Sequence, residues 1–344
     1  MKFVCYKNFS QLPASANDLF LKSEKDSLFF SRLWFDNLVT TSLKNDQVIY
    51  LACVVCNNRV LALLPLMKRT EANWYSLTNH YSPLYTLLVV KNDQQKILSC
   101  LAQGLKQLPF KSLRLESIAE KDSSIDCLQR AMESSGFSCH RYLRFFNWSH
   151  QIHDQSFDDY MNARPARVRN TIKRKSRKLE REHGYNVRLF TSGDLKQALA
   201  DYNAIYKASW KANESAADFI QGIAESTSNS GWLRLAILYI KDQPVAGQIW
   251  FVLHGKANIF RLAYDESWKK YSPGSILIKF MMEYVIETDK VVEIDFLTGN
   301  ERYKQDWISE CKQRWGLNCI KNIDSKSKVE QFVLSLKKFV SFQR

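Results

Sequence analysis

The stretch from Leu262 to Trp307 constrains the fold of this chain more than any other segment. It predicts a strand that ends at Tyr264, a turn over 271–274, an amphipathic helix and a second strand over 291–295. Strand, turn, helix and strand in this order form a right-handed crossover between parallel strands. The free N–H groups at the start of such a helix form an anion site. The stretch therefore predicts an α/β fold with a candidate phosphate site at the turn.

Motifs along most of the chain resemble those of the CelD-like acetyltransferases, the acetyltransferase-6 group of the GNAT superfamily, which are related to the FemAB aminoacyltransferases. The matching motifs are Phe157 to Tyr160 with the basic helix after it, Ser209-Trp210, Pro244 to Ala246, Tyr264-Asp265, Tyr271 to Gly274, Asp295-Phe296, Gly299, Tyr303-Lys304 and Trp307. The resemblance implies an α/β (α+β) chain with the acyl-CoA N-acyltransferase fold, in two GNAT-like halves with mixed central sheets. It also implies an acyltransferase activity.

One motif departs from the family pattern. The usual GNAT phosphate loop has Gln or Arg, then Gly three positions later, then Gly or Ala two positions after that. Here these positions hold Tyr271, Gly274 and Ile276. The motif therefore leaves both acyl-CoA and a charged tRNA open as donors.

With 344 residues, the chain is long enough for two domains of ordinary size. The resemblance implies a degenerate GNAT-like N-terminal domain over 1–150 and a catalytic GNAT-like domain over 156–325. The polar stretch from Trp148 to Phe157 is predicted to link them. Apolar residues at helical spacing predict a C-terminal amphipathic helix within 326–344.

Hydrophobic periodicity and turn residues predict the elements of each half. In the first half we expect helices at 29–43, 94–107 and 124–134, and strands at 48–56, 59–66, 74–77, 85–90, 112–116 and 138–145. Asn57-Asn58 suits the tight turn of a hairpin. In the second half we expect helices at 157–181 with a break near Pro165, 195–211 and 217–228, and strands at 185–190, 232–240, 245–253 and 258–264.

The sequence predicts a soluble cytoplasmic protein. No apolar run approaches the ~18 residues that a membrane-spanning helix needs, and the first residues contain no signal-peptide core. The eight cysteines lie mostly in apolar runs, which suits buried thiols in a reducing compartment. Cys53 and Cys56 have CxxC spacing but lie within a predicted strand and have no second ligand pair, so we expect no metal.

Several reaction classes have no sequence motif in this chain. The sequence contains no P-loop, no dinucleotide-binding glycine motif, no HExxH, no GxSxG and no zinc quartet. Acyl transfer from an activated donor needs none of these. It requires a protein that orients an amine, holds the carbonyl oxygen as it becomes anionic and accepts one proton.

The donor is expected to bind at the turn and the helix start that follows it. Gly274 has no side chain to keep a phosphate away, and Ser275, Ile276 and Leu277 are expected to offer unpaired N–H groups. Tyr271 occupies the first position of the loop. The alternative is an ordinary helix start after a loop.

Four residues are candidates for the chemistry, each with an alternative role. Asp265 and Asp295 end strands beside the crossover, where a carboxylate acts as a base or binds the amine, or else caps a turn. Tyr303 could protonate the departing thiolate or pack against Trp307. Lys304 is similar to the lysine that FemAB-type enzymes place near the acyl carbonyl, where it would stabilise the oxyanion; otherwise it is a surface lysine.

The basic helix suggests an anionic partner. The formal charge of the chain is +14, and the positions from Arg164 to Arg181 hold nine cations with Glu180 as the single acid. Such self-repulsion destabilises a helix unless anions bind it. We therefore expect Arg174, Lys175 and Lys178 to contact an anionic acceptor, tRNA or lipid headgroups of a membrane surface; the alternative is a solvated face.

Together these features predict an N-acyltransferase that moves an acetyl or other acyl group from acyl-CoA to an amine. The resemblance implies an acceptor on a sugar-nucleotide, a cell-surface polysaccharide or another envelope precursor. One alternative is FemAB-like transfer from charged tRNA to a peptidoglycan precursor, and another is a non-catalytic basic binding protein. The sequence does not indicate the acceptor, the acyl chain length or the oligomeric state.

Overall fold

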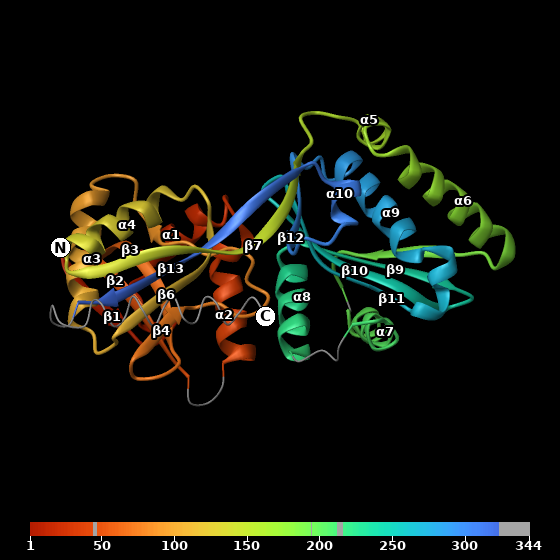
Figure 1. Cartoon of the computed structure of the whole chain (residues 1–344). Coiled ribbons are helices and arrows are strands. Elements are labelled where there is room, and N and C mark those ends of the chain that lie inside the picture. The colour runs from red at the N-terminus through yellow and green to blue at the C-terminus, as the bar shows by residue number, and fades with distance from the viewer. Residues whose placement is uncertain (44–46, 194, 212–215, 323–344) are drawn as a thin grey trace, which may run out of the picture.

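The computed structural model describes residues 1–43, 47–193, 195–211 and 216–322. The helix predicted within 326–344 lies outside these residues. The chain forms two lobes joined by two long antiparallel strands, which Figure 1 shows in yellow and blue. Within the described residues, no helix is both long and apolar enough to cross a bilayer.

The first half contains the elements up to the long strand β7. In chain order they are β1 (Lys2–Tyr6), α1 (Ala16–Ser23), α2 (Arg32–Ser42), β2 (Val48–Cys56), β3 (Arg59–Lys68), β4 (Asn73–Ser76), β5 (Leu88–Val89), α3 (Gln94–Gln107), β6 (Ser112–Ala119), α4 (Ser123–Ser134) and β7 (Phe137–Gln151), with short 3₁₀ helices η1 (Phe9–Gln11) and η2 (Leu28–Phe30).

The second half begins with two consecutive helices. Its elements are α5 (Phe157–Asn162), α6 (Ala166–Glu182), β8 (Asn186–Phe190), α7 (Lys196–Lys207), α8 (Ala217–Asn229), β9 (Leu233–Ile240), β10 (Gln243–Leu253), β11 (Lys256–Tyr264), the 3₁₀ helix η3 (Glu266–Tyr271), α9 (Pro273–Glu287), β12 (Glu293–Thr298), α10 (Lys304–Trp307) and β13 (Glu310–Lys321).

In the described part of the chain, the strands form one 13-stranded mixed sheet. Its order is β1-β2-β3-β4-β6-β13-β7-β12-β11-β10-β9-β8, with β5 paired to β3 off this path. The two halves repeat one pattern, in which β1-β2-β3-β4-β6 corresponds to β8-β9-β10-β11-β12. In each half the fourth and fifth of these strands are parallel and are joined by a helix, α3 or α9. The predicted crossover and the division into two similar halves are therefore confirmed.

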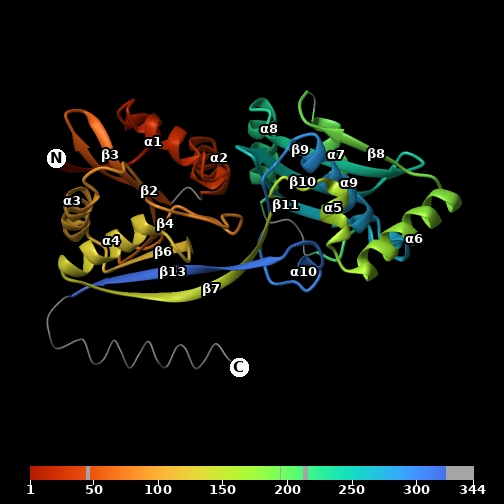
Figure 2. The same cartoon turned by 90° about the horizontal axis from the view of Figure 1, so that it is seen from above.

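The halves exchange their last strands. β13, which ends the second half, lies between β6 and β7, while β7 lies between β13 and β12. Figure 2 shows both strands running along one side of the two lobes. The domain limits 1–150 and 156–325 stay a prediction, to which the structure adds that β13 pairs with strands of both halves.

The lobes also meet through helices α2 and α8. The Trp34 ring on α2 lies edge-on to the Phe219 ring on α8, with centroids 5.2 Å apart. The Asn37 side chain donates to the Phe219 carbonyl at 3.1 Å. All three residues are buried, so the two lobes share apolar core.

Local signals placed many elements correctly. Helix α3 has the predicted bounds, the helix break at Pro165 separates α5 from α6, and Asn57 and Asn58 take φ values of 47° and 61° in the β2–β3 turn. The linker prediction was wrong at its start, because Trp148 to Gln151 continue β7. The prediction missed β1, α1 and β13, and only Leu88–Val89 of the expected strand 85–90 forms β5.

Candidate active site

An opening between β11 and β12 is the candidate active site. The two parallel strands pair only from Lys256–Glu293 to Asn258–Asp295, although both continue further. Beyond this point their backbones are not joined, and two cavities lie along the opening. Beyond this point the facing backbone groups of the two strands have no partner in the neighbouring strand, so other groups must pair with them.

The first cavity, which we call the α9 cleft, has a volume of about 430 Å³. Its wall is formed by α6, β11, the first turns of α9 and the segment around α10. The lining residues are Arg167, Val168, Thr171, Ile172, Trp210, Leu262, Tyr264, Gly274, Ser275, Ile278, Tyr303, Asp306 and Trp307. The second cavity, which we call the interlobe cleft, has a volume of about 320 Å³ and is lined by residues of both lobes, including His80, Tyr81, Lys211, Arg261, Gly299 and Lys304. Leu262 and Tyr303 line both clefts, so the two are neighbours.

The start of α9 is at the wall of the α9 cleft. A Cβ atom at Gly274 would lie 3.1 Å from the Tyr264 ring, so the glycine allows close approach to the cleft. Within the described residues no acceptor is found for the Gly274 N–H. The expectation of free N–H groups at Ser275 and Ile276 was wrong, because both donate to the Ser272 carbonyl, at 3.1 and 3.2 Å.

The other residues that were predicted to bind the acyl donor lie in the core. Tyr271 is buried, and its hydroxyl is 2.7 Å from His183 Nε2 and donates to Glu182 Oε2 at 2.8 Å. These bonds tie η3 to the end of α6. The side chains of Ile276 and Leu277 are buried in the core of the second lobe. Of the five predicted donor residues, Gly274 and Ser275 line the α9 cleft.

Lys304 is a buried lysine at the interlobe cleft, with 3% of its surface exposed. Its Nζ donates to the carbonyls of Phe296 and Thr298, at 3.2 and 2.5 Å, and forms an ion pair with Glu301 at 3.0 Å. Burial lowers the pKa of Lys304, and the Glu301 carboxylate opposes this shift. An ammonium has three N–H donors, so all of them are engaged here. Only the Glu301 side chain, which is 56% exposed, is free to move away.

Gly299 lets Glu301 reach Lys304. The glycine has a φ of 120°, and an added Cβ would lie 2.3 Å from Glu301 Oε2. A larger residue would displace the carboxylate. The Glu301–Lys304 ion pair therefore depends on the absence of a side chain at Gly299.

Tyr303 and Trp307 frame the α9 cleft from α10. Tyr303 is 38% exposed, and its ring lies edge-on to Phe296 with centroids 6.1 Å apart. Trp307 is buried, and its carbonyl accepts hydrogen bonds from Tyr160 at 2.7 Å and from Arg164 at 2.9 Å. Arg164, expected as part of a basic surface, is thus a buried residue that fixes α10.

The two candidate aspartates are not brought together. Asp295 pairs with Asn258, whereas Asp265 directly follows β11, seven residues beyond Asn258 and thus about 23 Å away at the rise of a strand. Asp265 caps η3 by accepting from the N–H and the hydroxyl of Ser267, at 2.9 and 2.8 Å. It does not line the α9 cleft or the interlobe cleft.

Asp295 shapes the end of β12. Its Oδ1 accepts from the Leu297 N–H at 2.6 Å and from the Asn147 side chain at 2.9 Å. Leu297 takes a φ of 56°, which costs a non-glycine residue free energy and is held by this bond. Because the Phe296 and Thr298 carbonyls on either side accept from Lys304, Asp295 positions the lysine indirectly.

The three cations predicted to bind an anion lie further along α6 than the α9 cleft. Arg174 is exposed, Lys175 donates to the Lys270 carbonyl, and Lys178 lies over the Tyr271 ring at 5.5 Å and 4.0 Å from Glu182. The cation of this helix that lines the cleft is Arg167, which pairs with Asp306.

Sequence reasoning missed several residues of the interlobe cleft. Arg261 stacks its guanidinium 4.7 Å from the Tyr206 ring, and the Lys211 ammonium donates to the Leu262 carbonyl at 2.5 Å. Tyr81 comes from the other lobe. These residues belong to three separate segments and form no motif, so no local pattern could have found them.

Comparisons with known proteins agree with this architecture. A family model described as an acetyltransferase (GNAT) domain matches residues 166–305. No curated protein sequence gives a significant match. The crystal structure of FemX is similar at 12% identity, with a TM-score of 0.63, over 93% of this chain and 98% of that chain.

Two other solved structures are also similar over nearly their full lengths. A tandem GNAT protein from the clavulanic acid biosynthesis pathway is 11% identical, with a TM-score of 0.54, over 94% of this chain and 99% of that chain. The C-terminal domain of a putative lysylphosphatidylglycerol synthetase from Agrobacterium fabrum is 10% identical, with a TM-score of 0.55, over 95% and 96%. At these identities the likeness shows the fold. That fold is a tandem GNAT-like architecture. The family match shows that residues 166–305 form an acyltransferase domain of the GNAT type.

Proposed function

We propose that this protein transfers an acyl group, acetyl or longer, from acyl-CoA to a primary amine in the opening between β11 and β12. The observation that carries the proposal is the pair of adjoining clefts, one at the start of α9 and one reaching the other lobe. Two substrates can thus meet at a shared wall formed by Leu262 and Tyr303. Such juxtaposition supplies much of the rate of a transfer between two bound reactants.

The donor phosphates occupy the α9 cleft beside Gly274. Helix α9 has 15 residues, and its positive N-terminal end faces the cleft with the Gly274 N–H available. Arg167 and the hydroxyl of Ser275 add further polar groups to this wall. This placement retains Gly274 and Ser275 from the sequence prediction.

The acceptor amine lies in the interlobe cleft and attacks the thioester carbonyl. Glu301 turns outward, and the N–H of Lys304 that it vacates donates to the developing oxyanion. Tyr303, which lines both clefts, protonates the departing thiolate and regains its proton from the nitrogen of the attacking amine. Asp295 acts through the β12 turn that holds Lys304, in place of the base role expected from the sequence.

The acceptor class that we propose is an amine on a sugar-nucleotide or another envelope precursor, used in the cytoplasm. Lys211 and Arg261 at the interlobe cleft suit an anionic acceptor of this kind. The exposed cations of α6 would keep such a precursor, or an anionic membrane surface, near the site.

Transfer of an aminoacyl group from charged tRNA is the second candidate. The paired N–H groups of Ser275 and Ile276 leave fewer donors for a pyrophosphate than the loop motif suggested. The basic helix α6 adjoins the same cleft, which would suit a polynucleotide.

Thermal unfolding with acetyl-CoA, longer acyl-CoAs and charged tRNA tests both candidates. A ligand at 100 times its Kd adds about 2.7 kcal/mol to the free energy of unfolding, which raises the melting midpoint visibly. Gly274→Val should abolish the acyl-CoA shift, because its side chain enters the cleft and meets Tyr264. Gln95→Val, on the first turn of the corresponding helix α3, is the matched control and should keep it. A shift with charged tRNA and none with any CoA would favour the second candidate.

A further inference from the structure

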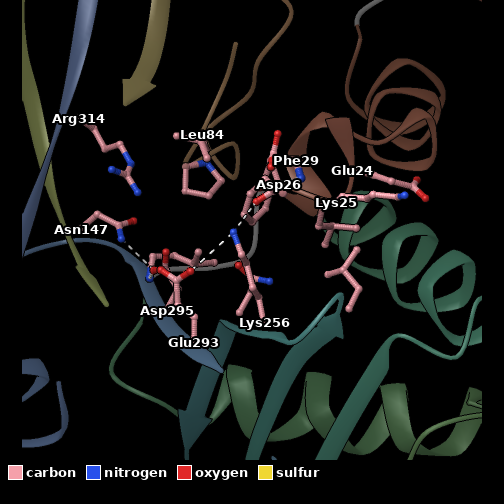
Figure 3. Close-up of a pocket in the computed structure, with 16 residues that line it drawn as sticks. Glu24, Lys25, Asp26, Phe29, Leu84, Asn147, Lys256, Glu293, Asp295 and Arg314 are labelled. Carbon is pink, nitrogen blue, oxygen red and sulfur yellow. Dashed lines mark hydrogen bonds and ion pairs between the residues drawn. The ribbon is translucent and has the colours of Figure 1, made fainter. Parts of the chain in front are cut away.

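A third cavity, which we call the polar cavity, lies between the lobes and adjoins the interlobe cleft. It has a volume of about 90 Å³ and is lined by the segment 24–29 and by β7, β11, β12 and β13, as Figure 3 shows. Pro83 and Leu297 line both this polar cavity and the interlobe cleft. The polar cavity is therefore next to the place where we put the acceptor.

Two buried side chains in the polar cavity each have one polar atom without a hydrogen-bond partner. Arg314 is 7% exposed and Asn147 is 0% exposed, and in the described part of the chain Arg314 Nε and Asn147 Oδ1 have no hydrogen-bond partner. Buried polar groups of this kind cost free energy unless something pairs with them. Figure 3 shows the Arg314 guanidinium directed toward Asn147 and Asp295.

Asp295 completes the set with a free acceptor. Both of its hydrogen bonds, from Leu297 N–H and Asn147 Nδ2, go to Oδ1, which leaves Oδ2 able to accept another. Burial raises the pKa of Asp295, and Arg314 opposes this shift without lying at ion-pair distance. The cavity thus presents a guanidinium donor and two acceptors, separated by a gap.

The charges around the gap favour a neutral ligand. Lys256 and Lys312 both pair with Glu293, at 3.6 and 3.2 Å, and Lys312 also pairs with Glu310 at 3.7 Å, so two carboxylates compensate the two lysines. Arg314 would attract an anion that Asp295 repels, and the reverse holds for a cation. An amide satisfies both, because its carbonyl accepts from Arg314 while its N–H donates to Asp295 Oδ2 or Asn147 Oδ1.

We propose that the polar cavity is a subsite for a neutral amide group of the acceptor, such as a peptide bond or the N-acyl group of an amino sugar. Its volume equals that of about three water molecules, which is enough for one small amide. The assignment to the acceptor rests on the proposed function, whereas the amide binding itself does not.

Titration of the ¹⁵N-labelled full chain with acetamide tests the subsite. The Arg314 Nε–H resonance, identified as the one lost in Arg314→Met, should move with acetamide and stay unchanged with acetate or methylammonium. Titration with N-acetylglucosamine and with alanyl-alaninamide then distinguishes a sugar source of the amide from a peptide source. No response to any amide would show that the cavity holds water alone and would overturn the proposal.

Two variants should change the preferred charge. Arg314→Met should weaken acetamide binding about tenfold, seen at the Leu297 backbone amide, and make methylammonium the better ligand. Asp295→Asn removes the opposing charge and should make acetate bind. Arg141→Met is the control, because Arg141 lies on β7, like Asn147, but pairs with Asp126. This variant should preserve the response to acetamide. Unchanged selectivity in Asp295→Asn, which keeps the size of the side chain, would contradict the subsite even if Arg314→Met fails to fold.

The same samples test the amide subsite and the acyl-CoA donor independently of each other. Melting with acyl-CoA reports the α9 cleft, and the Arg314 resonance reports the polar cavity. A response to amides without a CoA-dependent melting shift would support the amide subsite and contradict acyl-CoA as the donor. A melting shift with CoA and no response to amides would support the donor and contradict the subsite.

Discussion

The two lobes have the same strand order but differ at one gap in the sheet. In each lobe the fourth and fifth strands of the repeat pair over three residues and then part. In the first lobe the chain itself fills the gap, because the Tyr85 N–H donates to the Ser117 carbonyl and its hydroxyl donates to the Pro65 carbonyl, at 2.9 and 2.6 Å. In the second lobe the corresponding gap is open to two clefts.

The segments that follow the fifth strand also differ between the lobes: one packs in the core and the other lines a cleft. In the first lobe Asp122 caps α4 through the N–H groups of Ser124 and Ile125 and accepts from Thr86. In the second lobe the corresponding segment places Lys304 at the edge of the cleft. One copy of the fold has therefore used its gap for core packing, and the other has kept it for ligands.

Emptying the filled gap of the first lobe gives the strongest test of this difference. Tyr85→Ala should lower the free energy of unfolding by about 3–5 kcal/mol, because it leaves a cavity in the core and removes a buried hydrogen bond. Tyr303→Ala, in the open gap, should cost less than about 1 kcal/mol. Denaturant unfolding of both variants measures this, and equal losses would show that the two gaps do not differ.

Removing the cation from the open gap should impair chemistry more than donor binding. Lys304→Met should lower the rate of single-turnover transfer by roughly 100- to 1000-fold, the usual effect of losing one oxyanion donor. It should also reduce stability by about 1–3 kcal/mol, since the Phe296 and Thr298 carbonyls lose their donor. Lys279→Met, on the outer face of α9, is the control. Wild-type turnover in Lys304→Met would limit the lysine to a structural role.

The charged faces of the lobes offer a smaller test. Replacing Arg174, Lys175 and Lys178 by Gln should weaken binding of a polyanion about tenfold at low salt, with less effect as salt shortens the Debye length below ~8 Å. The acyl-CoA melting shift should be unaffected. The same change at Lys91, Lys96 and Lys106 in the first lobe is the control. Equal weakening by both triple variants would mean that only the total charge matters.

The smallest effect concerns the pH dependence of stability. Burial raises the pKa of Asp295 above 3.8, so the folded state holds this proton at pH values where the unfolded state has lost it. Its contribution to stability therefore falls as pH rises from about 3.8 through the raised pKa. The Asp295→Asn variant should lack this loss of stability. The difference between the melting midpoints of the wild type and the variant should therefore change with pH between about 3.8 and the raised pKa. An identical pH dependence would place the titrating carboxylate elsewhere.

Local sequence signals were sufficient where neighbours in sequence determine structure. The hairpin at Asn57-Asn58 and the helix break at Pro165 follow from backbone preferences of single residues. Strand β13 was missed because its partners β6 and β7 lie far away in sequence and no alternation marks it.

The site shows the same limit. Gly274 was found from its turn, but the burial of Tyr271 depends on how α6 packs on η3, and the engagement of Lys304 depends on carbonyls exposed by the turn at Leu297. Neither contact leaves a local pattern. The polar cavity combines β7, β13 and both lobes, so the sequence offers no motif for it.

The strand exchange also affects how the chain folds during synthesis. Cys139 of β7 faces Cys319 of β13, a separation of 180 residues. While the first lobe emerges from the ribosome, β6 has no partner on the side that β13 later occupies, and that edge remains open to pairing with other chains. Such high contact order slows folding, since the last loop must close before the sheet is complete. We therefore expect nascent chains that lack β13 to need protection from aggregation, even though more than half of the fold is already present.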